Sequence, residues 1–393
     1  MKIEFSYIRN RIQEHRKDDL LQACYNYLDD RSQEHKPIWF AFLLMKWTYI
    51  YGEKKYPPKA LNQKRFANIF NKISDFNSEH ISSFIKSGNM NRAMTILYSQ
   101  QFYLQENVYK EKIATQIKLY HTLKSRYNIN ASFQSKTGFS ILDFLSILFL
   151  TWVYINIDQL NKKGLYFDGY LREDFLNVAA QITEVEKVRK FLNLLVLDPH
   201  KPEEKIQGIK TNIKNESLQS LERSFFTLYP LQYFNNDIKV IHKGIFNYTI
   251  NNYIYDFLKA NDPDFTTEFG ARFEKYIELG LKEISAHYIN EVELKKQLPK
   301  HSNLVDFIIE ADNIFIECKA IEMQPYPSVN PTDELLYNSL KDSILKAYFK
   351  QLYNVSKHIN EEQENWGIIL TYKKLFWSQF TDLFDLGKEK YDI

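Results

Sequence analysis

The chain has 393 residues, of which 44% are hydrophobic and 25% are charged, and its formal net charge at pH 7 is +2. A chain of this length exceeds the usual size of a single hydrophobic core, so we expect at least two domains. Only two cysteines are present, which excludes a disulfide scaffold and a cysteine zinc site and fits a reducing cytoplasm. The small net charge does not by itself indicate a nucleic-acid partner, because the local density of Lys and Arg decides phosphate affinity.

Most of the first 235 residues carry apolar side chains at three- and four-residue spacings, which predicts a mainly α-helical region. The predicted helices cover residues 8–28, 37–51, 64–84, 92–127 and 172–197, and polar connectors are expected at residues 128–138 and 199–215. We find no repeat of fixed period and no glycine-rich phosphate loop. We therefore expect residues 1–235 to bind substrate, a partner protein or a second copy of the chain, or to regulate access to a site elsewhere.

The most apolar run of this region covers residues 139–157, and Asp143 and Asn156 interrupt it. A bilayer span needs about 20 uninterrupted apolar residues, so a buried helix is favoured over a membrane span. The first residues soon turn charged and show no signal peptide. We expect no membrane association.

A basic cluster flanks Pro57-Pro58, where two consecutive prolines interrupt regular secondary structure. Its members are Lys54, Lys55, Lys59, Lys64 and Arg65. Such a cluster can contact phosphate, but a solvated basic loop is the more frequent outcome. We expect the solvated loop and keep phosphate binding as the alternative.

The stretch of residues 304–321 predicts a β-hairpin. Side chains alternate through residues 305–310 and again through 314–319, and both runs are rich in apolar β-forming residues, which is typical of strands. The Asp312-Asn313 pair suits the turn, because both residue types tolerate a left-handed backbone. Successive side chains of a strand point to opposite faces, so Glu317 and Lys319 share one face. A short hairpin brings Asp306 beside them.

Asp306, Glu317 and Lys319 together suit metal-dependent attack on a phosphodiester. Neighbouring carboxylates repel each other, and a hard divalent cation relieves that repulsion. The alternative for Glu317 and Lys319 is an exposed ion pair of little energetic value, and for Asp306 it is a turn-closing role. The apolar flanks of all three favour the metal site. Cys318, on the other face, is expected to be a small core residue rather than a reactive thiol.

These residues resemble the PD-(D/E)XK nuclease superfamily, which has the restriction-endonuclease-like fold. In that family a helix with a Glu is followed by a strand with an Asp, a strand with (Asp/Glu)-x-Lys, and then a helix and a strand. Asp306 matches the strand Asp, and Glu317-Cys318-Lys319 matches the (Asp/Glu)-x-Lys motif. Val305 stands where the family name has Pro, a position that often varies. The resemblance covers residues 262–375, about a third of the chain.

The helices of the family pattern also have counterparts in this chain. Residues 269–281 read as the first helix and supply Glu274, with Glu268 as the alternative acid. Residues 340–359 read as the later helix and contain Gln351, where many members place a polar residue. Residues 365–372 then read as the last strand. For Glu274 and Gln351 the alternative is a solvated helix surface.

The resemblance implies a role for each residue. Asp306 and Glu317 would ligate Mg²⁺, or Mn²⁺ in its place, together with the Cys318 carbonyl and Glu274, because hard cations prefer oxygen ligands. The metal would polarise the phosphate and lower the pKa of its bound water. Lys319 would orient that water and offset charge in the transition state. A further polar residue, Gln351, would position the strand or the water.

We therefore expect an α/β carboxy-terminal nuclease core, residues 236–393, with a mixed central sheet flanked by helices, after a large mainly α-helical region, residues 1–235. The expected function is that of an Mg²⁺-dependent DNA endonuclease of restriction, repair or antiviral defence, with RNA as a variant substrate. The alternative is a non-catalytic nucleic-acid or protein interaction module on the same fold. The expected partners are nucleic acid and, through the helical region, a second copy or a partner protein.

Overall fold

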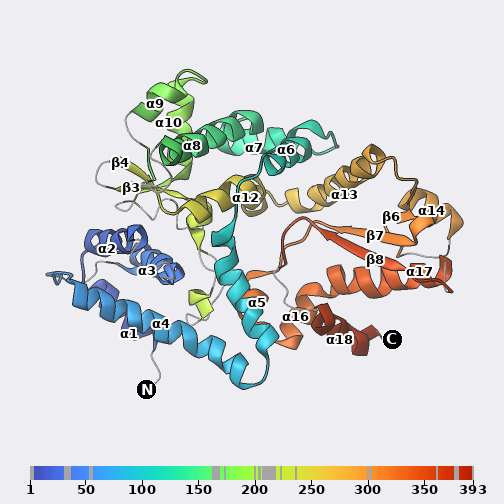
Figure 1. Cartoon of the computed structure of the whole chain (residues 1–393), viewed down its shortest axis with the longest axis horizontal. Coiled ribbons are helices and arrows are strands. Elements are labelled where there is room, and N and C mark those ends of the chain that lie inside the picture. Colours follow the sequence, from blue (N-terminus) through green and yellow to red (C-terminus); the bar gives the residue numbers. More distant parts are fainter. Residues whose placement is uncertain are drawn as a thin grey trace. The chain divides into compact units, whose positions relative to one another are not determined.

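The computed structural model describes residues 4–30, 37–52, 56–161, 169–171, 174–198, 201, 205, 218–221, 224–234, 237–298, 300, 303–359, 362–375 and 380–391. These residues are mostly helical and form two small mixed sheets of four strands each (Figure 1). The chain divides into two compact units. The first comprises Met1–Ala114 and Asn130–Leu258, and the second comprises Thr115–Ile129 and Lys259–Ile393. The division at residue 235 expected from the sequence does not coincide with a boundary between these units.

The first unit is built around α3 (Ile38–Tyr51), in which every residue from Phe40 to Tyr49 is buried. A helix that is apolar on all sides is typical of the centre of a core. Three helices pack against it or against one another: α1 (Phe5–Gln13), α2 (Lys17–Asp29) and α4 (Gln63–Lys86). The predicted helix of residues 8–28 is thus two helices, which separate near His15.

Further helices follow along the chain, and one of them corrects the sequence analysis. Residues 128–138 were expected to form a polar connector, but Ile129–Thr137 is the helix α7. Its anchors are Ile129 and Phe133, both fully buried and one helical turn apart. The others are α5 (Met90–Gln101), η1 (Phe102–Gln105), α6 (Lys110–Ile117), η2 (Lys118–Thr122), α8 (Ile141–Asn161), α9 (Asp174–Ala179), α10 (Val185–Leu195), η3 (Leu218–Ser220), η4 (Phe225–Thr227) and α12 (Lys243–Asn261).

The apolar run of residues 139–157 lies mainly in α8, where Phe144 and Leu148 are among the buried residues. Among the helices described here, none taken singly has both the length and the apolar character to cross a bilayer. In the part of the chain that the structure describes, α7 and residues 141–156 of α8 pass that test as a pair, and the two are bent by 65° at their junction.

A small sheet, three of whose four strands lie in the predicted helical region, was not expected from the sequence. Its strands are β1 (Tyr170–Leu171), β2 (Val196–Leu197), β3 (Leu231–Phe234) and β4 (Asp237–Val240), in the order β1-β4-β3-β2. Strands of two to four residues are too short to show a period of two in the sequence. Of the connector expected at residues 199–215, nearly all lies outside the described residues.

The second unit contains the sheet β5-β6-β7-β8, in which β7 pairs antiparallel with β6 and parallel with β8. A mixed sheet flanked by helices agrees with the expected architecture at this level. The strands are β5 (Ile289–Asn290), β6 (Phe307–Ile309), β7 (Ile314–Lys319) and β8 (Trp366–Thr371). The helices are α13 (Phe265–Glu283), α14 (Glu291–Gln297), η5 (Glu310–Asp312), α15 (Pro325–Val329), α16 (Asp333–Leu340), η6 (Lys341–Leu345), η7 (Ala347–Leu352), α17 (Tyr353–Ile359) and α18 (Phe380–Tyr391).

Helices cover both faces of this sheet, with α13 on one side and α17 on the other (Figure 1). Phe307 and Ile316 cluster with Leu281 of α13. The alternate residues of the same two strands, Ile308 and Phe315, lie in a separate cluster with residues of η7 and α17. The apolar alternation recognised in the sequence therefore fills two different cores.

The turn of the β6–β7 hairpin has the predicted residue at its left-handed position. Asn313 has φ 51° and ψ 39°, a conformation that Asn tolerates better than most residues. The Asn313 side chain also donates a hydrogen bond to Gln363 Oε1 over 2.9 Å. This turn fixes the pairing of Ile309 with Ile314 and so sets the register of the acidic residues at the other end of the hairpin.

Candidate active site

The hairpin register places Asp306 opposite Glu317. Phe307 pairs with Ile316 in this antiparallel hairpin. Asp306, which precedes Phe307, therefore faces Glu317, which follows Ile316. The Asp306 carboxylate lies against the opposite strand, where its Oδ2 accepts a hydrogen bond of 2.6 Å from the Cys318 N–H. Asp306 itself immediately precedes β6 rather than lying within it. Its side chain thus takes the place of a strand partner for β7.

Glu317 is the centre of the contacts on this face. It is only 1% exposed, and its Oε1 accepts a hydrogen bond of 2.8 Å from Gln351 Nε2 and one from Lys319 Nζ. The same Gln351 amide donates to the Leu304 carbonyl over 2.7 Å. Within the described part of the chain, the second oxygen of Glu317, Oε2, is buried without a hydrogen-bond partner. An orphaned carboxylate oxygen in a buried position is costly unless a ligand completes it.

The carboxyl groups of this region ionise less readily than free ones. Burial and then the charge of Asp306 raise the pKa of Glu317 to about 7, while Lys319 opposes them. Burial is also the main cause that raises the pKa of Asp306, and the Cys318 backbone opposes it. Such shifts mark groups that a nearby positive charge would stabilise as anions, and they are frequent at functional sites.

Glu274 enters the same electrostatic group from α13. Burial, followed by the charge of Asp306, raises the pKa of Glu274 to about 7, and Lys319 lowers it. The alternative acid, Glu268, lies in the first turn of α13, where its charge acts on Arg272 instead. Of the two helix acids considered from the sequence, Glu274 is therefore the one coupled to the hairpin.

Glu291, which the sequence analysis missed, is a fourth acid of the group. Its backbone N–H donates to the Asp306 carbonyl over 3.0 Å, and its negative charge raises the pKa of both Asp306 and Glu274. Glu291 is the first residue of α14, directly after Asn290, whose side chain forms a capping box with Glu293. The Asn-x-x-Glu pattern in the sequence was the available signal for a helix start at this point.

The donor set fits a hard cation with few protein ligands. Two carboxylates meet across the hairpin, and one of them has an oxygen without a partner among the described residues. The Lys319 backbone carbonyl accepts a hydrogen bond from Tyr372 N on the β8 side. By strand alternation the neighbouring Cys318 carbonyl points toward the β6 side of the hairpin, where Asp306 lies. In the ranges that the structure describes, no three His, Cys, Asp or Glu side chains already converge as a complete cation site. Mg²⁺ commonly keeps several waters and one or two carboxylates.

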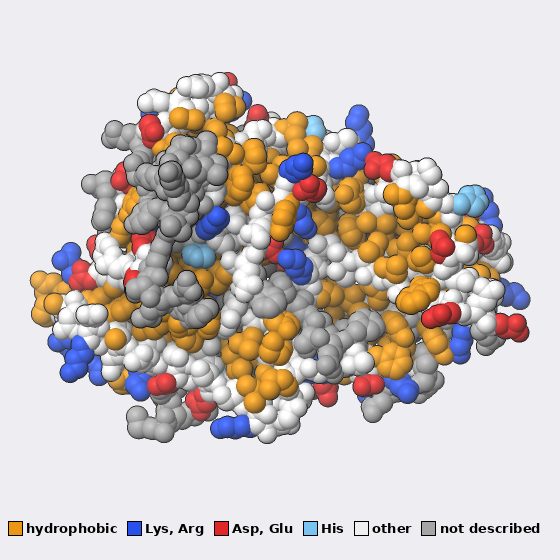
Figure 2. Space-filling view, in the orientation of Figure 1, with side chains coloured by type: hydrophobic (Ala, Val, Ile, Leu, Met, Phe, Trp, Pro, Cys, Tyr) orange, Lys and Arg blue, Asp and Glu red, His pale blue; other side chains and the backbone are white. Residues whose placement is uncertain are grey.

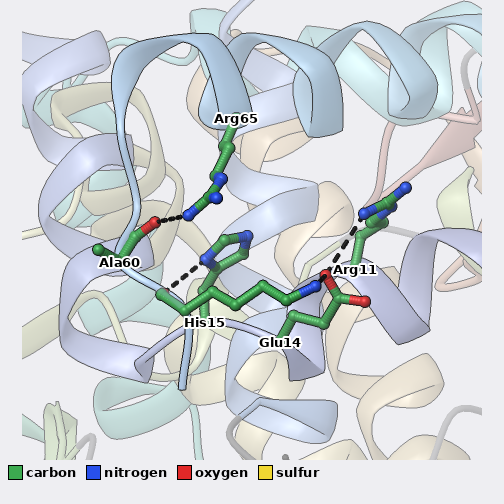
Figure 3. A network of polar contacts seen from close by, with 6 residues as sticks. Arg11, Glu14, His15, Ala60 and Arg65 are labelled. Atoms are coloured by element: carbon green, nitrogen blue, oxygen red, sulfur yellow. Dashed lines mark hydrogen bonds and ion pairs between the residues drawn. The ribbon is translucent and has the colours of Figure 1, made fainter. Parts of the chain in front are cut away.

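The basic cluster near Pro57 is held in local contacts (Figure 3). Lys59 Nζ lies 3.0 Å from Glu14 Oε2, Arg65 Nη1 donates to a loop carbonyl over 2.5 Å, and His15 Nδ1 lies 2.9 Å from the Lys59 carbonyl. These contacts fasten the loop to the end of α1. Of the other members of the cluster, Lys64 is exposed, and Lys54 and Lys55 lie outside the described residues.

Comparisons with protein-family models, curated proteins and solved structures gave no significant match to this chain. The case for a function therefore depends on the residues and geometry of the site itself.

Proposed function

We propose that the chain is a divalent-metal-dependent nuclease that hydrolyses phosphodiester bonds, with DNA as its substrate and internal bonds as its targets. The observation that carries the proposal is the arrangement around Glu317. Asp306 lies opposite this carboxylate in the hairpin register, while Lys319 and Gln351 both donate to one of its oxygens. A buried glutamate with a half-buried aspartate opposite it, beside a lysine, suits catalysis that depends on positioning and on electrostatic stabilisation of a phosphoryl group.

Each residue has a role that follows from its contacts. Asp306 and Glu317, with the Cys318 carbonyl, are the groups that would hold Mg²⁺ or Mn²⁺, and Glu274 would complete the site directly or through water. When bound, the metal lowers the pKa of water and neutralises phosphate charge. Lys319 orients the attacking water and offsets the charge that develops on the phosphate. The remaining amide, Gln351, fixes the rotamer of Glu317.

The face drawn in Figure 2 shows, among the described residues, no large patch of a single charge that would identify the substrate. On the face seen in Figure 2, described Lys and Arg side chains are interspersed with Asp and Glu. With a net charge of +2, affinity for a polyanion must come from local contacts, and it should fall steeply with salt. We propose that the first unit supplies those contacts or recruits a partner or second copy, as in a restriction, repair or antiviral nuclease.

The experiment compares supercoiled plasmid, linear duplex, single-stranded DNA and RNA, each with Mg²⁺ and with EDTA. Cleavage is expected with Mg²⁺ only and is expected to disappear in Glu317→Gln. The matched control is Glu310→Gln, which changes an exposed acid at the turn of the same hairpin. Cleavage of RNA but of no DNA substrate would change the proposed substrate from DNA to RNA. Binding without cleavage in any metal would instead favour the non-catalytic interaction module.

A further inference from the structure

The segment Thr115–Ile129 belongs to the second unit although it lies far from the rest of that unit in sequence. It is held by Arg272 of α13, a side chain that is only 4% exposed. The Arg272 guanidinium donates to the Leu119 carbonyl over 3.2 Å, to Ser125 Oγ over 2.5 Å and to the Tyr127 carbonyl over 2.6 Å. One buried cation thus joins three points of the segment to one helix.

Aromatic contacts extend the same attachment to β8. Tyr120 of the segment stacks on Phe269 of α13 with 5.6 Å between ring centroids. The Tyr120 hydroxyl hydrogen-bonds to the hydroxyl of Tyr372, and the Tyr372 N–H donates to the Lys319 carbonyl over 3.3 Å. The segment therefore contacts α13, the helix that carries Glu274. It also contacts Tyr372, which directly follows β8, the strand that pairs with β7 at Lys319.

Arg272 and Glu274 are two residues apart, which is a rotation of about 200° around a helix. They consequently point to nearly opposite sides of α13. The Arg272 side chain reaches the segment, while Glu274 is coupled electrostatically to Asp306. A helix fixed on one side by three directional hydrogen bonds cannot roll or slide without moving the group on its other side.

We propose that Arg272 is a positioning residue that sets the rotation of α13, and with it the place of Glu274, by locking the helix to the segment Thr115–Ile129. This inference depends on the proposed function, because it gives that segment a part in building the metal site. The segment is continuous in the chain with the first unit at both of its ends. The first unit would then be linked covalently to a part of the chain that positions a metal ligand, in addition to any contacts it makes with substrate.

The experiment is a double-mutant cycle in the full-length protein with Arg272→Met and Glu274→Gln. The measurements are Mn²⁺ affinity by calorimetry, and kcat and KM on the substrate that the wild type cuts. Arg272→Met alone is expected to weaken Mn²⁺ binding and lower kcat by about 10–100-fold, as for groups that orient metal ligands. In the Glu274→Gln background, Arg272→Met is expected to change Mn²⁺ affinity and kcat by no more than about twofold each. The matched control is Arg126→Met, because Arg126 is an exposed arginine of the same segment.

Equal losses in both backgrounds would overturn the inference, because a general loss of structure is additive with loss of Glu274. So would a folded Arg272→Met protein with wild-type Mn²⁺ affinity and kcat. If circular dichroism shows that Arg272→Met does not fold, Arg272→Lys and Ser125→Ala are tested in the same cycle and judged by the same criterion. Wild-type protein that neither binds Mn²⁺ nor cuts overturns the nuclease proposal and this inference together, whereas additivity in an active protein overturns the inference alone.

Discussion

At the scale of single residues, Lys319 has a dual position. Its amine pairs with the buried Glu317, yet its own side chain remains 20% exposed, so it can reach a group arriving from solvent. The contact with the carboxylate orients the lysine ammonium group and leaves its other N–H donors able to bind a further group. The same geometry therefore serves both folding of the site and contact with a phosphate.

Lys319→Ala is expected to lower the cleavage rate by about 10²–10³-fold, because one electrostatic contact to the developing charge is lost. Folding should survive, since the apolar faces of β7 are formed by other residues and Glu317 can take up a proton when its cation is removed. The measurement is cleavage together with the urea unfolding midpoint. Lys282→Ala serves as the control, because Lys282 also pairs with a glutamate but is exposed on α13. Wild-type cutting by a folded Lys319→Ala protein would remove Lys319 from the mechanism.

At the scale of elements, α13 is followed by a serine in an unusual backbone conformation, one residue after the C-cap Ile284. Ser285 has φ 55°, and the bonds from Ser285 N to Lys282 O and from Ala286 N to Leu281 O, each 3.0 Å, form the Schellman pattern that favours glycine at this position. We expect Ser285→Gly to raise the free energy of unfolding by about 0.5–1 kcal/mol, because glycine relieves the left-handed strain.

Urea unfolding measures this change, with an unaltered slope as the sign that only stability has moved. Ser83→Gly is the matched opposite, because Ser83 lies inside α4 and glycine there should destabilise by a similar amount. A loss of stability on Ser285→Gly would show that the hydroxyl makes a contact that outweighs the backbone strain.

The start of α12 supplies a prediction about pH. His242 precedes this helix and accepts a hydrogen bond of 3.1 Å from Gly244 N at Nδ1. Burial, with help from Lys243, lowers the pKa of His242 from 6.5 to about 4. As pH falls through that interval the unfolded chain binds the proton first, so stability is complete above the upper value and declines toward the lower one.

His242→Asn keeps an acceptor at the helix start and removes the titration. The variant is expected to lose less stability than the wild type between about pH 7 and about pH 4, by on the order of 1–3 kcal/mol. Unfolding midpoints of the two proteins across that range test this. Parallel pH profiles would mean that His242 titrates normally in the folded protein.

The elements also show why part of the fold was readable in the sequence. The β6–β7 hairpin was predicted because its six-residue runs show a clear period of two and its turn contains Asn313. Asp306, Glu317 and Lys319 followed from that hairpin, since its register puts Asp306 opposite Glu317. Glu274 and Gln351 were proposed only from the family resemblance. The sheet of β1 to β4 was missed because its strands are too short for periodicity. Glu291 was missed because its place beside Asp306 depends on a pairing between β5 and β6 that local pattern does not encode.

At the scale of the whole molecule, the second unit is discontinuous in sequence. No local pattern indicates that residues 115–129 should leave the helical region, because their partners, such as Arg272, follow about 150 residues later. A fragment of residues 259–393 alone would expose Phe269 and leave a buried guanidinium without its acceptors, which is costly.

We expect this fragment to unfold at lower temperature than the same fragment with residues 115–129 fused to it through a flexible linker, by roughly 10 °C or more if the segment contributes about 2 kcal/mol. Thermal unfolding followed by circular dichroism compares the two. Identical midpoints would show that the segment is an accessory to the second unit, and would weaken any role for it in placing Glu274.

The discontinuity of the second unit has a consequence for the order of events on the ribosome. Tyr127 is synthesised 145 residues before Arg272, which at about 5–20 residues per second is roughly 7–30 s. During that interval the segment is tethered at both ends by chain that can already be folding, and it exposes to solvent Tyr120 and the carbonyls that later accept hydrogen bonds from Arg272. The nascent protein therefore passes through a period in which the segment Thr115–Ile129 has been synthesised but α13, to which it binds, has not. Synonymous codon changes that slow translation between the segment and α13 should increase binding of the exposed segment by chaperones or by neighbouring chains.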